Sequence, residues 1–253
     1  LLSDLKRRQF FSGFNSSPEK ISQAFERLAQ APKQRSLIRK LVMSYSVNKM
    51  KKIHYGQVLP IEDVEAILGF VNSIVRIECI CRRGFLGTEQ RYCYCVTLGP
   101  NGGELFKLMK EISASYQAGP FASGMEFLTK EEMLANFRKY EQEGLCHTVW
   151  TFVTPFIAGI CNCDRSDCAA MKATFAHNFP VFFRAEYVAE LNRDLCNGCR
   201  QCMRVCQFGA MGYSAANKKV VIDQSRCYGC GVCRSSCTKA VSYTHLTLPT
   251  KRI

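Results

Sequence analysis

The sequence predicts an α+β protein with two domains: a mainly helical or mixed domain over residues 1–185 and a small α+β domain over residues 186–240. Three observations predict this. Apolar residues recur at helical spacing in several early segments, the spacing changes to two before the first cysteines, and the end of the chain repeats one cysteine pattern. With 253 residues, the chain can bury a core in each domain.

Four helices are predicted in the first domain. Ser17 and Pro18 resemble an N-cap and first helical turn, so a helix is expected over residues 17–29. A second is expected over residues 34–50 and a third within "LPIEDVEAILGFVNS" at residues 59–73. The fourth follows Thr129, which forms a capping box with Glu132, and Gly144 is its expected stop.

Strands are predicted where the apolar period becomes two. The segment "SIVRIECICRR" at residues 73–83 predicts a strand that places Cys79 and Cys81 on one face. "HTVWTFVTPF" at residues 147–156 is also β-prone and leads into "ICNCDRSDC". The longest apolar run, residues 149–161, is shorter than the roughly 20 residues that a membrane helix needs and contains proline, so no membrane span is predicted.

The second domain contains an internal repeat. "LNRDLCNGCRQCMRVCQFGAM" from Leu191 aligns with "IDQSRCYGCGVCRSSCTKAVS" from Ile222, 31 residues later. Each copy has the spacing C-x2-C-x2-C-x3-C, which lets three thiolates wrap a loop around an iron–sulfur cubane. The cysteines are Cys196, Cys199, Cys202 and Cys206 in the first copy and Cys227, Cys230, Cys233 and Cys237 in the second. Gly198, Gly229 and Gly231 allow the backbone to close around such a group.

This pattern resembles the bacterial two-cluster ferredoxin module over residues 186–240, about a fifth of the chain. The resemblance implies a ferredoxin-like α+β fold and two [4Fe–4S] clusters, with the fourth cysteine of each run crossing to the other cluster. One cluster would take Cys196, Cys199, Cys202 and Cys237, and the other Cys227, Cys230, Cys233 and Cys206. Gln207 and Thr238 stand where that family usually has proline, a departure that removes no ligand.

Zinc and disulfides are the alternatives for these cysteines. Paired C-x2-C knuckles are typical of structural zinc, but a third cysteine at the same interval, in both copies, exceeds what one tetrahedral ion needs. Disulfides fit less well, because neighbouring cysteines in such runs cannot all reach suitable partners.

Eight further cysteines precede the repeat, in C-x-C and C-x-C-x4-C arrangements. They are Cys79, Cys81, Cys93, Cys95, Cys146, Cys161, Cys163 and Cys168. In strands, C-x-C places both sulfurs on one face, so several segments could converge on a third iron–sulfur cluster or a zinc ion. The candidate ligands are Cys81, Cys93, Cys161, Cys163 and Cys168. The alternative is that some are buried thiols that act as small hydrophobes.

The upstream segments also look like those of larger bacterial and archaeal ferredoxin-type proteins, which carry a cysteine-bearing domain ahead of two clusters. The resemblance is carried by "VNSIVRIECICRR", "RYCYC", "GLCHTVWTF" and "ICNCDRSDC". It implies electron transfer and names no substrate.

The net charge of +13 is concentrated at one end, in an expected basic helical segment over residues 1–55. Residues 1–52 carry twelve Lys and Arg against three acids. Solvated helix faces are the favoured explanation of this charge, and the alternative is an acidic partner: a redox protein, a membrane surface or nucleic acid. Among these, an acidic redox protein is the partner that we expect. Arg82 and Arg83, which follow Cys81, could donate to a cluster or to an anionic partner, but they are interpreted as solvated surface residues. Clustered cysteines indicate a reducing compartment, so a cytoplasmic location is expected.

These features predict an iron–sulfur electron-transfer protein or electron-relay subunit. No phosphate-binding glycine loop, dinucleotide fingerprint or nucleophile–base motif is present, so independent enzymatic turnover is not predicted. A metal-stabilised regulatory or nucleic-acid-binding protein is the alternative and depends only on charge. A reductase with an open coordination position is the third class considered.

The end of the chain departs from the pattern before it. "VSYTHLTLPT" resembles a translated transposase adapter from a sequencing library, and the chain begins with Leu1. We therefore expect a gene fragment in which residues 241–253 are a non-native tail.

Overall fold

The computed structural model describes residues 55–79, 81–82, 86, 90–98, 125–151, 157–176, 181–237, 239 and 242–246, besides residues 23, 44–45, 47–49 and 52. The helices expected over residues 17–29 and 34–50 therefore lie outside the described residues, apart from isolated positions. Most of the basic segment, residues 1–52, lies outside them as well.

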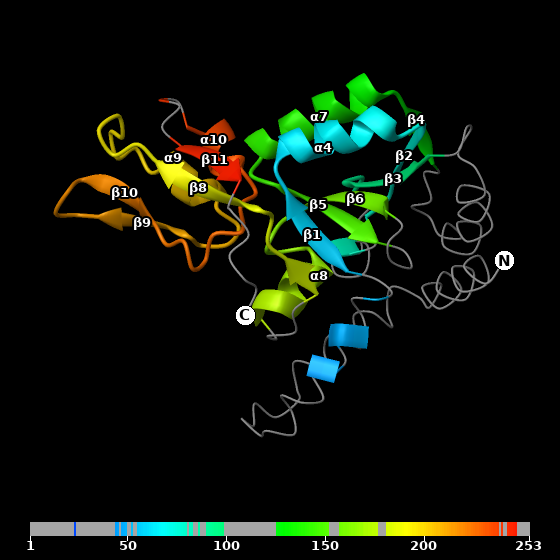
Figure 1. Cartoon of the computed structure of the whole chain (residues 1–253), viewed down its shortest axis with the longest axis horizontal. Coiled ribbons are helices and arrows are strands. Elements are labelled where there is room, and N and C mark those ends of the chain that lie inside the picture. Colours follow the sequence, from blue (N-terminus) through cyan, green and yellow to red (C-terminus); the bar gives the residue numbers. More distant parts are fainter. Residues whose placement is uncertain are drawn as a thin grey trace.

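A seven-stranded sheet organises the described part of the first domain (Figure 1). The strands are β1 (Gly56–Leu59), β2 (Ser73–Ile77), β3 (Cys93–Thr97), β4 (Glu126–Leu128), β5 (Cys146–Thr151), β6 (Ile157–Cys163) and β7 (Phe182–Phe183). Their order is β4-β2-β3-β6-β5-β1-β7, and each neighbouring pair is antiparallel except β1 and β7. Because β3 pairs with β6, segments nearly seventy residues apart lie side by side, with Cys93 opposite Cys161.

Two helices cover one face of this sheet, α4 (Ile61–Phe70) and α7 (Lys130–Gln142) (Figure 1). Val64 and Leu68 of α4 and Met133 and Phe137 of α7 are buried against apolar side chains of the strands. The predicted capping box is confirmed: the Glu132 N–H donates to Thr129 Oγ1 at 3.2 Å, and the Thr129 N–H donates to Glu132 Oε2 at 2.8 Å. Gly144 adopts φ +87° just after the helix, as expected of its stop.

The other face of the sheet carries a second core. Val58, Trp150 and Met171 pack there with several cysteines. The short helix α8 (Ala169–Met171) and the π-helical turn η2 (Lys172–Ala176) cover this face.

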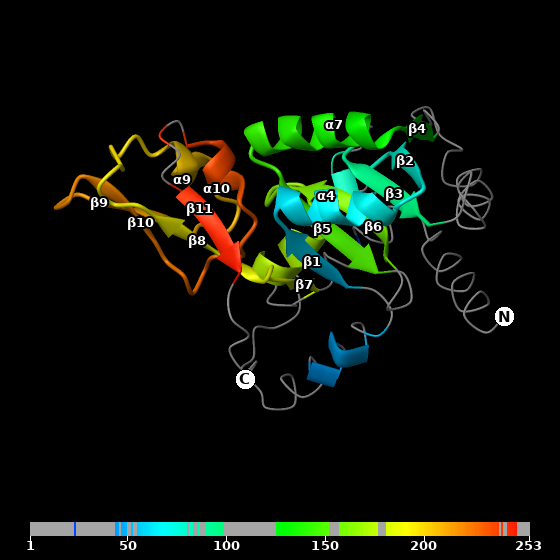
Figure 2. The same cartoon turned by 45° about the horizontal axis from the view of Figure 1, so that its top comes forward.

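The described residues after 186 form two strand pairs and two short helices, which we call the carboxy-terminal module or second domain. β8 (Tyr187–Leu191) pairs with β11 (Ser242–Leu246), and β9 (Met211–Ser214) pairs with β10 (Lys219–Ile222), both antiparallel. The helices are α9 (Gln201–Val205) and α10 (Val232–Ser235). Figure 2 shows this module at one end of the molecule, with α10 beside the end of α7.

Polar contacts join the two domains. The Tyr187 hydroxyl donates to Asp63 Oδ1 at 3.0 Å, and the Ser235 hydroxyl donates to Glu141 Oε2 at 2.9 Å. Arg234 also forms an ion pair with Glu62. Helices α4 and α7 thus hold the carboxy-terminal module from the side of β8 and α10.

The α+β class is confirmed, with one correction to the sequence prediction. The described part of the region before residue 186 is mixed, as one of the two predicted alternatives, and is built around a sheet. The strand expected over residues 73–83 ends at Ile77, and the backbone is helical at Cys81 and Arg82. The ladder between β2 and β3 stops where Ile77 meets Cys93, so residues beyond Ile77 have no β3 residue to pair with. No helix in the described part of the chain is long and apolar enough to cross a bilayer.

Candidate metal centres

The first predicted set of ligands gathers around α9. Burial, followed by the charges of Cys237, Cys199 and Cys196, raises the pKa of the Cys202 thiol to about 11. Cys202 therefore lies close to the three cysteines with which it is predicted to share a cluster. Cys237, from the second repeat, is part of this group, as the crossed arrangement requires.

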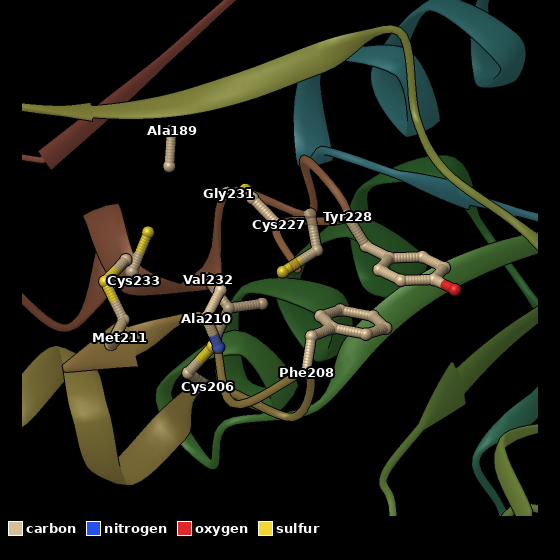
Figure 3. Close-up of a pocket in the computed structure, with 11 residues that line it drawn as sticks. Ala189, Cys206, Phe208, Ala210, Met211, Cys227, Tyr228, Gly231, Val232 and Cys233 are labelled. Carbon is tan, nitrogen blue, oxygen red and sulfur yellow. The ribbon is translucent and has the colours of Figure 1, made fainter. Parts of the chain in front are cut away.

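The second predicted set lines a cavity. Its lining residues are Ala189, Cys206, Phe208, Ala210, Met211, Cys227, Tyr228, Cys230, Gly231, Val232 and Cys233. Figure 3 shows Cys206, Cys227 and Cys233 around this space, with the rings of Phe208 and Tyr228 on one side. Those rings stack, with centroids 4.4 Å apart and planes 7° apart. A cavity that exposes four thiols and no competing nitrogen ligand suits an iron–sulfur cluster.

Two glycines let the chain close around these sites. Gly198 and Gly229 occupy matching positions of the repeat, and both adopt φ +70°. A Cβ at Gly198 would lie 2.2 Å from the Lys218 carbonyl oxygen, and one at Gly229 would lie 2.2 Å from the Tyr187 carbonyl oxygen. Both the backbone conformation and the close approach therefore require glycine.

Strand alternation places the upstream C-x-C cysteines on the face opposite α4 and α7. Along β3, Tyr94 and Val96 enter the helix-covered core, so Cys93 and Cys95 point the other way. Along β6, Ile160 enters that core and Cys163 enters the opposite one. The facing register of β3 and β6 then brings Cys93 and Cys161 together.

Six upstream thiols form a continuous group, which we call the upstream thiol group. Each thiol lies close enough to the next to shift its pKa, in the order Cys161, Cys93, Cys79, Cys81, Cys168 and Cys163. All five candidate ligands belong to it, together with Cys79, which sequence reasoning had not selected. Hydrogen bonds from Cys81 and Cys93, followed by the charge of Arg82, hold the pKa of Cys79 well below its ordinary value.

Arg82 is buried at this group, which contradicts its interpretation as a solvated residue. Its side chain is 3% exposed, and its guanidinium is paired with Asp164. It also donates to Cys79 Sγ at 3.7 Å and to the Asn162 carbonyl oxygen at 3.3 Å. The guanidinium lies 4.1 Å from the centre of the Tyr92 ring. A buried cation fixed beside thiols favours a site that carries negative charge.

Cys146 connects the upstream thiol group to the carboxy-terminal module. It is fully buried in the second core together with Cys163 and Cys168, and Cys206 and Cys230 pack against that core. Burial raises the pKa of the Cys146 thiol, and the neighbouring charges that add to this effect are those of Cys230 and Cys168. The upstream cysteines and the second ligand set therefore share one apolar interior.

Gln207, one of the two departures from the expected proline, bridges the domains. Its Nε2 donates to the Gly144 carbonyl oxygen at 2.7 Å, and its Oε1 accepts from the Arg165 N–H at 2.9 Å. Proline could form neither contact. The other departure, Thr238, lies outside the described residues.

Within the described part of the chain, no three or more His, Cys, Asp or Glu side chains converge closely enough to hold a single metal ion. This holds for the carboxy-terminal cysteines as well as for the upstream thiol group.

Comparison with known proteins identifies the carboxy-terminal segment. Residues 189–241 match the family model described as a 4Fe-4S dicluster domain. The resemblance to a two-cluster ferredoxin domain is thereby confirmed for this segment, and the match supports iron–sulfur clusters and an electron-transfer role.

Two curated relatives match the chain over a short segment. The chain is 37% identical over 46 residues to a protein named "Uncharacterized ferredoxin-like protein YdhY" from Escherichia coli strain K12, and equally to the protein of that name from Shigella flexneri. The alignment covers 17% of this chain and 22% of each relative. The chain thus spans about a fifth of the length of the relatives it matches.

Proposed function

We propose that this chain is an electron-transfer protein or relay subunit that carries two [4Fe–4S] clusters in crossed ligand sets. The observation that carries the proposal is the packing of cysteines from both repeats into one interior, in the segment that matches a dicluster domain. Cys237 lies with the first set, and Cys206 lines the cavity of the second. Clusters bound there would supply one-electron oxidation and reduction.

The ligands that we assign are those of the crossed sets. Cys196, Cys199, Cys202 and Cys237 hold the first cluster, and Cys227, Cys230, Cys233 and Cys206 hold the second. This assignment is supported by the cysteines whose charges act on Cys202, described above. It is also supported by those whose charges act on Cys233, namely Cys227, Cys206 and Cys202. The closeness of Cys202 to Cys233 also supports a short separation between the two sites.

In this proposal the upstream thiol group holds a third metal centre, an iron–sulfur cluster or zinc, and binding a single zinc ion would require the thiols to come closer together than they lie in this structure. Support comes from six thiols that gather from four segments, and from the buried cation Arg82 among them. The Arg82 guanidinium, although paired with Asp164, also donates to Cys79 Sγ, so a positive charge lies beside thiols that would be deprotonated when they hold a metal.

The partner is a redox protein, and the net charge of +13 favours an acidic one. We assign the domains to residues 1–185 and 186–240, with a cytoplasmic location. A nucleic-acid-binding role stays a prediction based on residues 1–52, most of which lie outside the described residues.

Anaerobic purification followed by iron, sulfide and zinc analysis and EPR of the reduced protein tests the proposal. Two clusters give about eight iron and eight sulfide per chain. Zinc without labile sulfide would refute the carboxy-terminal assignment.

The upstream centre is tested by Cys93→Ala, with Cys95→Ala as the matched control on the same strand. Cys93 lies within the upstream thiol group, whereas Cys95 packs with Val75. We expect Cys93→Ala to lower the metal content by one centre while the two carboxy-terminal clusters remain, and Cys95→Ala to leave the content unchanged. Equal metal content in both variants would contradict a third centre.

A further inference from the structure

The two ligand sets differ in their access to solvent. All sixteen cysteines lie in the described part of the chain, and Cys199 alone among them is exposed. Its counterpart in the second repeat, Cys230, packs against the second core at the domain boundary. The first repeat therefore exposes one of its cysteines to solvent, whereas the second repeat does not.

The residues around the two cysteines differ accordingly. Tyr228 and Val232 in the second repeat occupy the positions of Asn197 and Gln201 in the first. Val232 is 1% exposed and Tyr228 packs against the second core, whereas Asn197 and Gln201 are exposed. Within the described part of the chain, the first domain covers the second ligand set and leaves the Cys199 side open to another molecule.

Positive charge surrounds Cys199. Arg200 follows it in the sequence and stacks on Tyr213 at 3.7 Å from the ring centre, so this cation is held in place beside Cys199. Lys218 lies next to the Cys199 loop, because its carbonyl oxygen approaches Gly198. Lys219 Nζ donates to the Arg193 carbonyl oxygen at 2.5 Å, which ties a further cation to the start of this loop.

One apolar side chain and one acid accompany these cations. Leu195 is 60% exposed within the same loop. Asp194 is the acid, and Arg193 is exposed beside it. Figures 1 and 2 show the loop between β8 and α9 and the turn between β9 and β10 at the end of the module that faces away from the seven-stranded sheet. No described element of the first domain covers this end.

We propose that the surface formed by Arg193, Leu195, Arg200, Lys218 and Lys219, here called the Cys199 rim, is the docking surface for an acidic redox protein. The inference rests on the proposed function, and it adds the place and the chemistry of the partner. Four cations against one acid give complementarity to a carboxylate-rich surface and speed its encounter. An exposed leucine among them supplies the apolar contact typical of a protein interface, which a phosphate backbone would not use.

Binding of an acidic flavodoxin to the metal-loaded full chain, measured by calorimetry at low and high salt, tests the docking surface. The variant Arg193→Glu/Lys218→Glu changes two of the four cations to acids. We expect it to weaken binding about tenfold or more at low ionic strength, and we expect the difference to disappear in high salt because exposed charges are screened. Lys130→Glu is the control: one such reversal, half the change in net charge, in the first turn of α7 at the other end of the molecule.

A second readout uses small ions of opposite charge. Ferricyanide takes one electron from the reduced protein at a rate that depends on nearby cations, and a cationic cobalt(III) tris-phenanthroline complex does so with the opposite charge dependence. In Arg193→Glu/Lys218→Glu the ferricyanide rate should fall and the cobalt rate should rise. The neutral variant Arg193→Gln/Lys218→Gln should lie between the wild type and the charge-reversed protein, and it serves if the reversed protein folds poorly.

Unchanged flavodoxin affinity, an equal loss in Lys130→Glu, or oxidation rates that move in the same direction for both ions would overturn the proposal. A failure of the proposed function would look different. It would appear beforehand, as protein that lacks iron and sulfide, whereas the calorimetry reports the docking surface itself.

Discussion

Removing the Gln207 side chain should loosen the junction between the domains. Gln207→Ala deletes the 2.7 Å bond to the Gly144 carbonyl oxygen and the 2.9 Å bond from the Arg165 N–H. An intramolecular hydrogen bond contributes about 0.5–1.5 kcal/mol net, so the two together contribute roughly 2 kcal/mol, the partly buried bond to Gly144 more than the exposed one.

The assay for Gln207→Ala combines unfolding with hydrogen exchange of the metal-loaded protein. The single tryptophan, Trp150, is buried in β5 and reports the first domain, while visible absorbance of the clusters reports the second. We expect the free energy of unfolding to fall by about 2 kcal/mol and the amide of Arg165 to exchange faster, because it has lost its acceptor. Peptides from β9 and β10 should keep their protection.

Gln201→Ala is the control, since Gln201 is exposed on α9. The reasoning fails if both variants lose the same stability, or if the exchange of Arg165 is unchanged in Gln207→Ala.

Three further predictions concern other parts of the chain. Gly229→Ala should destabilise the metal-loaded protein by at least about 2 kcal/mol in denaturant unfolding, because the new Cβ would meet the Tyr187 carbonyl oxygen and the backbone would stay left-handed. The control Gly69→Ala, in α4 with open space around it, should be neutral or slightly stabilising. Arg82→Leu should lower the free energy of unfolding by about 3–5 kcal/mol and reduce the metal content of the upstream thiol group, because Asp164 would stay buried without its ion pair. The control Arg138→Leu, which removes an exposed pair with Glu65, should lower it by less than about 1 kcal/mol in the same assay. A chain ending at Ala240 should keep its iron and sulfide, because every cysteine precedes that point; loss of iron on truncation would instead show that residues 241–253, which include β11, support the module.

Local sequence was sufficient to predict the structure of segments that depend only on their own residues. The capping box of Thr129 and Glu132 and the stop at Gly144 are short-range features, and each was predictable. A C-x-C pair in a strand must share a face, which is how the structure arranges Cys93 with Cys95 and Cys161 with Cys163. The dicluster pattern is similarly local, because most of each ligand set comes from one loop.

Contacts between distant segments could not be predicted in the same way. Adjacent arginines following a cysteine are ordinarily solvated, and Arg82 is buried only because Asp164, 82 residues later, lies beside it. Cys79 was not among the predicted ligands, and its place depends on the chain leaving the sheet after Ile77 and becoming helical at Cys81. Which strands become neighbours depends on the whole sheet, and β3 with β6 is such a pair.

Differences between the two repeats carry information that the shared cysteines do not. Where the first copy has Asn197, Arg200 and Gln201, the second has Tyr228, Gly231 and Val232. Residues that are normally buried thus replace residues that are normally exposed at the same structural position. Such a replacement is expected only where a repeat meets another part of the molecule, and the second copy is the one whose Tyr228 and Val232 pack with the first domain. In an internally repeated module, the copy that gains apolar residues between its ligands marks the side that the rest of the chain covers, and the copy that keeps charge marks the side left for a partner.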